Sequence, residues 1–227
     1  METAFKVKIC GITQSSDAIL ACQSGADAIG LNFYKRSLRH VKKDEAREIA
    51  NTVRNSDYAS TKIIGVFVNE DFESIKETVA LADLDYVQLH GDESAETTGR
   101  ELAGFNWIRA IRCHSLSNQQ IENQVDEWVS AGAHLVLLDS GSAKEYGGSG
   151  VQLPWKKLSE LNLNCPWALA GGLTPENVQQ AIELSRPNAV DTASGVEGFP
   201  GKKAADLVEQ FIKRSLESFK AVDQMER

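Results

Sequence analysis

The chain has few of the features that mark linkers, membrane spans or exported proteins. Its 227 residues include five prolines, and no stretch is rich in proline, glycine and serine together. Linkers between domains commonly have such compositions, so we expect a single domain over residues 1–227. No apolar run approaches the roughly 20 residues that cross a bilayer, and no basic segment followed by an apolar stretch opens the chain. We therefore expect no membrane partner and no export signal.

Cysteine and positive charge are also scarce. The four cysteines, Cys10, Cys22, Cys113 and Cys165, are widely scattered, with no CxxC pair and no histidine at metal-ligand spacing. We expect free thiols in a reducing cytoplasm and no metal site. The formal net charge is -8 and no basic stripe stands out. This balance argues against nucleic acid or an anionic membrane as a partner.

What the chain does have is a repeated alternation of short apolar runs and longer amphipathic stretches. Most of the apolar runs are nearly continuous, which is typical of parallel strands buried on both faces. The predicted strands are residues 5–10, 27–33, 62–68, 86–90, 107–112, 134–139, 167–171 and 189–193.

The amphipathic stretches between these strands predict helices. In one of them Ala46, Ile49 and Val53 recur at helical spacing. In another, Thr174 suits a helix N-cap and Pro175 suits the first helical position. The predicted helices are residues 15–24, 43–54, 71–82, 94–103, 117–131, 154–161, 175–185 and 201–219.

Eight strands that each precede a helix predict an α/β fold, a parallel eight-stranded (β/α)8 barrel, in a chain somewhat shorter than the usual ~250 residues. A weak internal repeat agrees, because small residues lead into the strands in the same way at 24–27, 82–85 and 131–134. An open doubly wound sheet is the alternative, but its GxGxxG fingerprint after the first strand is absent. From about residue 214 we expect a helical tail that frays.

In a barrel of this kind the active site forms at the carboxyl ends of the strands. Cys10 ends the first strand beside a glycine turn, where a thiol can transfer protons near neutral pH; alone, it also fits a small core side chain. Asp139 ends a buried strand, where partial burial raises the pKa of a carboxyl group, although a turn aspartate fits too. The further candidates at this end are Ser37, Arg39, Gln88, His90, Cys113 and Asp191.

Two of these candidates have an ordinary structural interpretation as well. Arg39 could hold a substrate carboxylate through a two-pronged hydrogen bond, but it also fits a solvated charge beside other basic residues. His90 fits a structural histidine as well as a catalytic one.

Three glycine-bearing segments follow the sixth, seventh and eighth predicted strands. Glycines expose backbone N–H groups that can surround an anion, and barrels commonly hold phosphate after strands seven and eight. One such cluster alone fits a tight turn, whereas three on neighbouring strands predict a phosphate-bearing ligand. The candidate residues are Gly148, Ser149, Gly150, Gly171, Gly172, Ser194 and Gly195.

Nine short motifs stand in order along the chain: KICGI at 8–12, GADAIG at 25–30, FY at 33–34 with Ser37 and Arg39, GVFVN at 65–69, VQLHGDE at 87–93, LD at 138–139, GGSG at 147–150, AGGL at 170–173 and SGVE at 194–197. Each motif alone is modestly specific, but nine in the right order are very specific. Together they resemble the phosphoribosylanthranilate isomerase family, barrel enzymes of tryptophan biosynthesis.

The resemblance implies an Amadori rearrangement of N-(5-phosphoribosyl)anthranilate to 1-(2-carboxyphenylamino)-1-deoxyribulose 5-phosphate, the third step from chorismate to L-tryptophan. It implies Cys10 as the general base and Asp139 as the general acid. The glycine-bearing segments would hold the phosphate. It implies no cofactor, because the substrate supplies both the electrons and the electron sink, and a cytoplasmic monomer or homodimer. The substrate-binding side chains would be Arg39 for the anthranilate carboxylate, Asp191 for the ribose, Gln88 and His90.

Two positions depart from the pattern expected of that family. Leu38 stands where a proline is common, and a freer loop there would leave Arg39 less preorganised. The segment 153–155 reads Leu-Pro-Trp where Phe-Asp-Trp is frequent, but Pro154 still suits the first turn of a helix. Two other functions remain open: another phosphosugar isomerase or epimerase barrel, with Cys113 as the second thiol at this end, and a non-catalytic barrel that binds a sugar phosphate.

Overall fold

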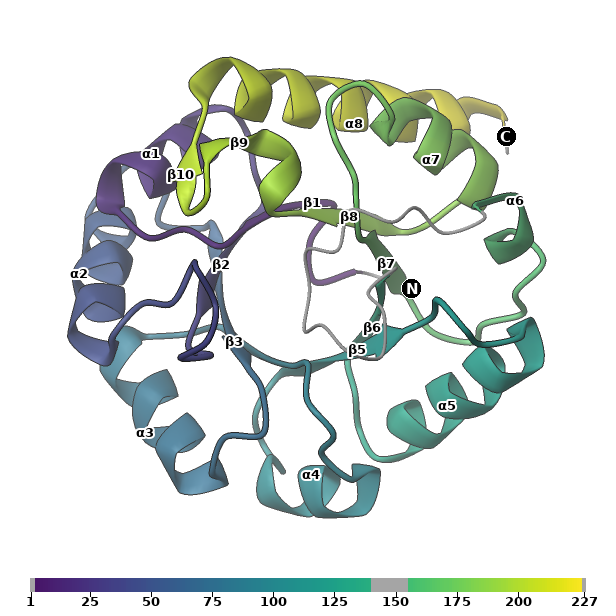
Figure 1. Cartoon of the computed structure of the whole chain (residues 1–227), viewed down its shortest axis with the longest axis horizontal. Helices are drawn as coiled ribbons and strands as arrows, with labels where there is room; N and C mark the ends of the chain where they lie inside the picture. Colours follow the sequence, from purple (N-terminus) through teal and green to yellow (C-terminus); the bar gives the residue numbers. More distant parts are fainter. Residues whose placement is uncertain (1–2, 140–154, 226–227) are drawn as a thin grey trace.

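The predicted barrel closes. A computed structural model describes residues 3–139 and 155–225. Its eight parallel strands pair in sequence order and form a ring (Figure 1). They are β1 (Val7–Cys10), β2 (Ala28–Asn32), β3 (Lys62–Phe67), β4 (Tyr86–Leu89), β5 (Trp107–Arg112), β6 (Leu135–Asp139), β7 (Trp167–Ala170) and β8 (Ala189–Thr192).

The helices lie outside this ring (Figure 1). Most begin and end within two or three residues of the predicted bounds, because their apolar residues recur at the spacing of one helix face. They are α1 (Ser15–Gln23), α2 (Lys43–Arg54), α3 (Phe72–Ala82), α4 (Ala95–Glu101), α5 (Asn118–Ser130), α6 (Trp155–Leu158), α7 (Val178–Ser185) and α8 (Ala205–Met225).

Side chains alternate between two cores along each strand. On β1, Val7 and Ile9 belong to the large apolar cluster between the strands and the helices. Because successive strand residues point to opposite faces, Lys8 and Cys10 face the barrel interior. Apolar side chains fill much of the interior, with Ala28, Ile64, Ile108, Leu137 and Ala168 among them. The polar side chains at the strand ends therefore project above an apolar plug.

The end of the chain differs from the prediction. Residues 194–203, partly assigned to a helix from 201, instead form a 3₁₀ turn (Ser194–Val196) and a short hairpin of β9 (Glu197–Phe199) and β10 (Lys202–Lys203). Helix α8 then runs unbroken from Ala205 to Met225. The helix continues past residue 214, from which we predicted fraying, and Phe219 and Val222 are buried at 4% and 8% exposure.

Helix α7 also begins later than predicted. Its N-cap is Asn177, not Thr174, and Pro175 lies in the turn before the helix. The amide group of Asn177 explains the shift: its Oδ1 accepts a hydrogen bond from the Thr174 N–H at 2.8 Å, and its Nδ2 donates to the Gly172 carbonyl at 2.8 Å. These bonds hold residues 174–177 as a turn and join it to the end of β7.

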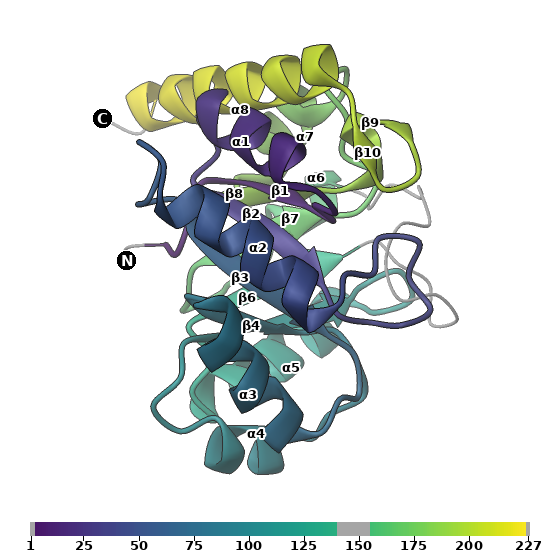
Figure 2. The same ribbon diagram turned by 90° about the vertical axis from the view of Figure 1, so that its left-hand side faces the viewer.

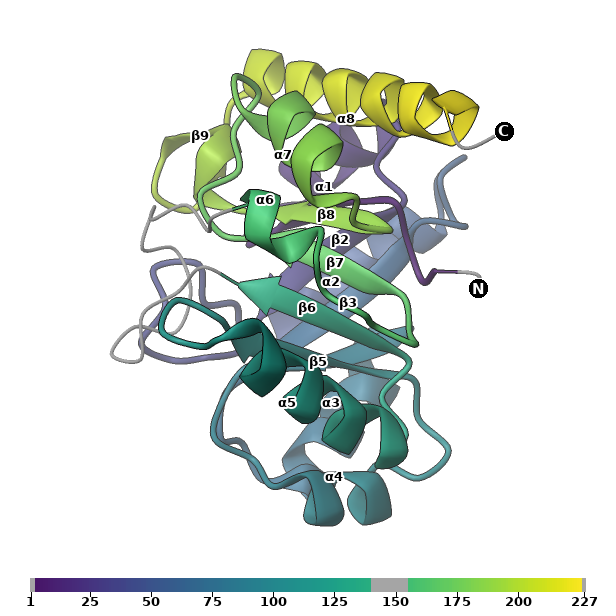
Figure 3. The ribbon, with the colours of Figure 1, turned by 90° about the vertical axis from the view of Figure 1, so that its right-hand side faces the viewer.

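Side views place the β9–β10 hairpin at one end of the barrel and the end of α8 at the other, near the start of the described chain (Figures 2 and 3). The hairpin end is the carboxyl end of the strands, since β9 follows β8 closely. None of the helices within residues 3–139 and 155–225 combines the length and the apolarity that crossing a membrane requires.

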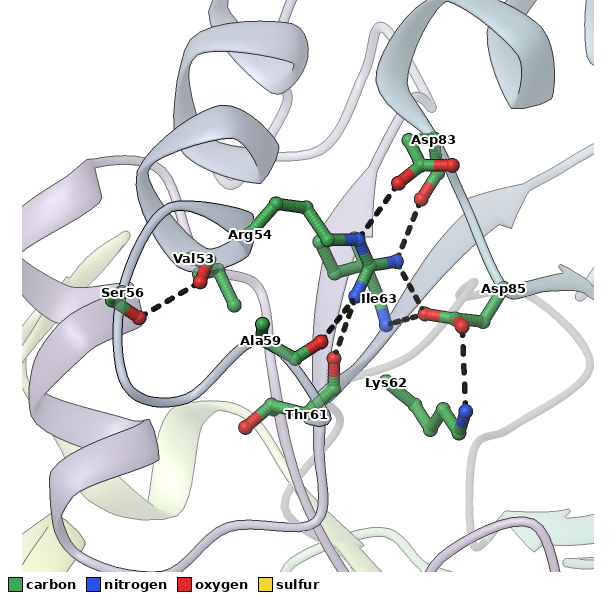
Figure 4. Close-up of polar contacts among 9 residues, drawn as sticks. All are labelled: Val53, Arg54, Ser56, Ala59, Thr61, Lys62, Ile63, Asp83 and Asp85. Atoms are coloured by element: carbon green, nitrogen blue, oxygen red, sulfur yellow. Dashed lines mark hydrogen bonds and ion pairs between the residues drawn. The ribbon is translucent and has the colours of Figure 1, made fainter.

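One arginine joins three segments at the amino end of the barrel (Figure 4). Arg54, the last residue of α2, donates from Nε to Asp83 Oδ2 at 2.8 Å and from Nη2 to Asp85 Oδ2 at 2.7 Å. Its Nη1 donates to the carbonyls of Ala59 and Thr61 at 3.1 and 3.0 Å. The planar guanidinium satisfies several acceptors at once, which a lysine cannot do. Arg54 therefore fixes the entries to β3 and β4.

Replacing Arg54 by Met removes these hydrogen bonds and leaves partly buried carboxylate and carbonyl groups without their donor. We expect the free energy of unfolding to fall by about 2 to 3 kcal/mol, the scale for lost hydrogen bonds to charged groups. Urea denaturation followed by circular dichroism measures it. Arg47→Met is the matched control on the same helix. Arg47 is half exposed, and its ion pair with Asp44 is long at 3.7 Å. Equal effects of the two substitutions would contradict the assignment.

Candidate active site

A cavity of about 650 Å³ opens at the carboxyl ends of the strands. It brings together most of the side chains singled out from the sequence, although they are far apart in the chain. Gly148, Ser149 and Gly150 lie outside the described residues, as do Leu153 and Pro154. The predicted site residues in the cavity wall are Cys10, Ser37, Arg39, Gln88, His90, Asp139, Gly171, Gly172, Asp191 and Ser194.

The four thiols have different environments. Cys10 is partly exposed, whereas Cys22, Cys113 and Cys165 are buried. Cys113 does not line the cavity: its Sγ lies 3.3 Å from the Ile111 carbonyl, to which it donates, and burial raises its pKa to about 12. A base must be deprotonated and within reach of its substrate. Cys10 meets the second requirement and Cys113 meets neither.

Asp139 and His90 form a close pair in the cavity wall. Asp139, at the end of β6, is 4% exposed, and His90, just after β4, is 9% exposed. His90 Nε2 lies 3.1 Å from Asp139 Oδ2. Asp139 is thus a largely desolvated carboxyl group beside an imidazole, an arrangement suited to holding and releasing a proton. The sequence predicted both residues at this end but not their contact.

A buried ionic cluster lies next to Cys10 in the barrel interior. Lys8, which is fully buried, has its Nζ 3.1 Å from Asp191 Oδ2 and donates to Gln88 Oε1 at 3.1 Å. Burial favours the neutral amine, but the nearby negative groups Asp191 and Cys10 outweigh it, so the pKa of Lys8 lies above its ordinary value. Burial raises the pKa of Asp191 although Lys8 opposes the rise.

Lys8 is absent from the residues predicted from the sequence. The sequence nevertheless contained an indication of its role, because Lys8 stands between Val7 and Ile9 in an otherwise apolar strand. Lysine is almost never fully buried unless it is paired. A charged residue at an inward position of a parallel strand therefore indicates an interior partner, and Asp191 on β8 is that partner: Lys8 and Asp191 are in register across the two strands.

Burial also governs the Cys10 thiol. It raises the pKa of Cys10, and the negative charge of Asp191 adds to the rise, while Lys8 and Lys203 act in the opposite direction. The net direction is upward, toward the protonated thiol. The nearby cations thus favour the thiolate and oppose the effect of burial.

Arg39 lies in the cavity wall with its guanidinium held from one side. Its Nε and Nη2 donate to the two carboxylate oxygens of Glu197, both at 2.7 Å, and Lys203 Nζ donates to Glu197 Oε1 at 2.8 Å. Burial opposes the charged form of Glu197, but Arg39 and Lys203 outweigh it, so the pKa of Glu197 is lowered. The ion pair joins the loop after β2 to the β9–β10 hairpin. It holds Arg39 in place although Leu38 was expected to leave this loop freer. Sequence reasoning assigned no role to Glu197 or Lys203.

The glycine-bearing loops after β7 and β8 contact each other. Gly171 and Gly172 have φ angles of 92° and 64°, which favour glycine. Thr192 Oγ1 donates to the Leu173 carbonyl at 2.7 Å, and Gly195 packs so closely on that carbonyl that a Cβ would overlap it. The two loops thus form one rim, in the position where barrels commonly bind phosphate.

A second cavity, at the amino end of the barrel, offers no comparable chemistry. Its volume is about 540 Å³, and Lys6, Asp27 and Lys62 are its charged lining residues. It contains neither cysteine nor histidine. Within residues 3–139 and 155–225, no three metal-binding side chains gather into a cluster.

A closed parallel barrel with a thiol, a buried carboxyl group, an arginine and glycine loops at its carboxyl end defines a (β/α)8-barrel enzyme for a small anionic substrate. The sequence profile of N-(5'phosphoribosyl)anthranilate (PRA) isomerase matches residues 7–214. The chain belongs to this isomerase family, and the predictions of fold class and family are confirmed.

Relatives and solved structures agree. The N-(5'-phosphoribosyl)anthranilate isomerase of Rubrobacter xylanophilus is 39% identical over 209 residues, covering 91% of this chain and 97% of the relative. The crystal structure of phosphoribosyl anthranilate isomerase from Thermotoga maritima superposes with a TM-score of 0.82 at 35% identity, covering 94% of this chain and 99% of the other. A further phosphoribosyl anthranilate isomerase structure, a complex with reduced 1-(o-carboxyphenylamino)-1-deoxyribulose 5-phosphate, has a TM-score of 0.77 at 34% identity and covers 94% of this chain and 99% of the other.

Replacing Glu197 by Gln leaves the cations Arg39 and Lys203 without their shared counter-ion. We expect the free energy of unfolding to fall by about 3 kcal/mol near pH 7, as when one partner of a buried ion pair is removed. The folded-state pKa of Glu197 lies below its unfolded value, so its contribution is complete above the ordinary glutamate pKa of about 4.3 and disappears as pH falls through the folded pKa.

Urea denaturation at a series of pH values measures this contribution. The difference in stability between the two proteins is expected to be constant near neutral pH and to shrink below about pH 4. Glu217→Gln, on the exposed face of α8, is the control and leaves stability nearly unchanged. A stability loss for Glu197→Gln that persists at low pH would rule out the ionic explanation.

Proposed function

We propose that the protein performs the Amadori rearrangement of its isomerase family in tryptophan biosynthesis with Cys10 as general base and Asp139 as general acid. The observation that carries this assignment is their placement. Cys10 is the cavity-lining thiol, and Asp139 is a buried carboxyl group in the wall of the same cavity. They come from β1 and β6, so a ring opening and a proton abstraction can occur on one bound substrate.

In the first step, Asp139 donates its proton to the furanose ring oxygen of N-(5-phosphoribosyl)anthranilate. The bond between C1 and the ring oxygen breaks, its electron pair stays on that oxygen, and the nitrogen lone pair forms a protonated imine with C1. The close contact with His90 Nε2, at 3.1 Å, supports proton exchange at Asp139. Burial favours the neutral form of any carboxylic acid, which is the form that can donate.

In the second step, the Cys10 thiolate removes the proton from C2. The electrons of the C–H bond form a double bond between C1 and C2, and the imine nitrogen becomes neutral. The resulting enolamine tautomerises to the ketone when the C2 hydroxyl loses a proton and C1 gains one. Carbon C1 is reduced and C2 is oxidised within one molecule, so the balance requires neither a redox cofactor nor a metal ion.

The cavity wall supports binding of each part of this substrate. Glu197 occupies the Nε–Nη2 edge of Arg39, which leaves the Nη1–Nη2 edge to bind the anthranilate carboxylate in a bidentate manner. Backbone amides of 171–172 and 194–195 suit the phosphate, and 148–150 would complete that site. Asp191, Gln88 and His90 line the same cavity, which supports contacts between these side chains and the sugar.

We also propose a cytoplasmic location and a monomeric or homodimeric state. All four cysteines are free, as expected where thiols are kept reduced. The related Thermotoga maritima enzyme is dimeric, which supports the homodimer. Size-exclusion chromatography with light scattering distinguishes a monomer of this protein from a homodimer. The substrate is a small phosphorylated molecule, and we expect no nucleic acid as a partner.

The test of the base is the decay of phosphoribosylanthranilate fluorescence in the presence of wild-type protein and of Cys10→Ser. We expect rapid decay with wild type and at least about 10²-fold slower turnover with the variant, the usual scale for a positioned base. Cys113→Ser is the matched control and is expected to keep near-normal turnover. Loss of activity in Cys113→Ser with an active Cys10→Ser would reverse the assignment. No decay with folded wild type would favour another phosphosugar substrate.

Replacing Asp139 by Asn removes the transferable proton and keeps the shape of the side chain. We expect kcat to fall by about 10²-fold or more while KM changes little, because the lost interaction belongs to the transition state. Steady-state kinetics with the same fluorescence assay separates the two constants. Near-normal turnover would refute the role of Asp139 as the acid.

A further inference from the structure

Lys8 lies in the barrel interior without lining the cavity. Its side chain is completely buried, whereas Cys10, Gln88 and Asp191, which surround it, are all part of the cavity wall. Lys8 precedes Cys10 by two residues on β1, so both side chains project from the same face of the strand. The ammonium group is thus one layer deeper than the thiol and out of reach of a bound substrate.

A glycine on the neighbouring strand makes room for the two side chains. Cys10 is in register with Gly30 of β2. A Cβ at Gly30 would lie 2.6 Å from Cys10 Sγ and 3.1 Å from Lys8 Cε. The thiol and the end of the lysine stem therefore converge on the space that the missing side chain leaves, and any larger residue would push them out of it.

We propose that Lys8 is a positioning residue whose buried ammonium group stabilises the Cys10 thiolate from within the barrel. The inference rests on the proposed role of Cys10 as the base. In a desolvated cavity a thiolate is unfavourable unless a cation is close, and Lys8 is a permanent cation there because it is held by Asp191 and Gln88.

The other charged groups around Cys10 do not replace Lys8. Asp191 is negative and acts against the thiolate, while Lys203 and Arg39 are positive and both pair with Glu197. Each of these two cations therefore has a carboxylate nearby that offsets its field at Cys10. Lys8 also pairs with a carboxylate, Asp191. Unlike Lys203 and Arg39, however, Lys8 lies on the same face of β1 as the Cys10 thiol and shares with it the space above Gly30.

A purely structural pairing of Lys8 with Asp191 is the competing explanation. Buried ion pairs contribute little to stability compared with well-packed apolar residues, so stability alone does not account for a lysine at this position. The two explanations differ in what they predict for Cys10. A structural role affects unfolding and substrate affinity, whereas the proposed role changes the pH at which the thiol ionises.

The measurement is the rate of Cys10 alkylation by iodoacetamide as a function of pH, read by mass spectrometry of the Cys10 peptide. The other three cysteines are buried, which keeps their background low. In Lys8→Met we expect the midpoint of the alkylation profile to rise by about one pH unit or more, with an approximately tenfold slower reaction at pH 7. The acid limb of the kcat/KM profile is expected to move in the same direction.

A pair of variants at Asp191 separates charge from damage to the fold. Asp191→Asn removes a negative charge and keeps Lys8, so the midpoint is expected to fall. Lys8→Met combined with Asp191→Asn leaves no unpaired charge, and its midpoint is expected to lie about one unit above that of Asp191→Asn. This comparison decides the proposal even if Lys8→Met alone does not fold. Lys62→Met, which removes a strand lysine 3.5 Å from Asp85 at the other end of the barrel, is the control and leaves the midpoint unchanged.

Alkylation requires no substrate, so it is independent of the proposed reaction. Midpoints that agree between Asp191→Asn and the double variant would overturn the role of Lys8, whatever the catalytic activity. If these two midpoints differ as expected but Cys10→Ser remains active, Lys8 does stabilise the Cys10 thiolate and Cys10 is not the base. A midpoint shift together with the same shift in the kcat/KM profile supports both.

Discussion

The interior of a closed barrel is the constraint on which this site depends. Strand residues alternate between the inside and the outside, so a polar residue at an inward position cannot turn toward solvent. Lys8 on β1 is such a residue, and it is fully buried. Its charge must be matched inside, and Asp191 on β8 and Gln88 on β4 match it. One buried lysine on β1 thereby holds side chains from two other strands, β4 and β8, at the base of the cavity.

A second ionic contact organises the rim in the same way. The loop after β2 and the β9–β10 hairpin are separated by more than 150 residues of sequence, yet Arg39 and Glu197 join them through two hydrogen bonds of 2.7 Å. The contact explains how Arg39 is preorganised although Leu38 stands where a proline is frequent in the family. A proline at this position would restrict the backbone; here the carboxylate of Glu197 restricts the guanidinium itself.

The sequence predicted what depends on local pattern and missed what depends on long-range pairing. Apolar runs predicted the strands β1 to β8, and the spacing of apolar residues predicted both ends of α2 as observed. Both patterns depend only on residues that are close in sequence. The hairpin at 197–203 was missed because it is short and polar. The burial of Phe219 in α8 was not predicted because it depends on the barrel beneath the helix. The role of Glu197 was missed since its partner Arg39 lies 158 residues away in sequence. Lys203 was missed with it, because Lys203 pairs with Glu197.

An acid and a base in one desolvated cavity face opposite requirements. Burial favours the neutral form of both groups, which suits the role that we propose for Asp139 as a donor and opposes the one that we propose for Cys10 as an acceptor. The neighbours differ accordingly: Asp139 contacts an imidazole in the wall, whereas Cys10 stands above an ammonium group that cannot leave the interior. Gly30 is then as necessary as the charges, because its missing side chain is the space in which Lys8 and Cys10 approach each other. The difference between the proposed acid and the proposed base therefore begins in the backbone register of β1 and β2, which sets Cys10 beside Gly30.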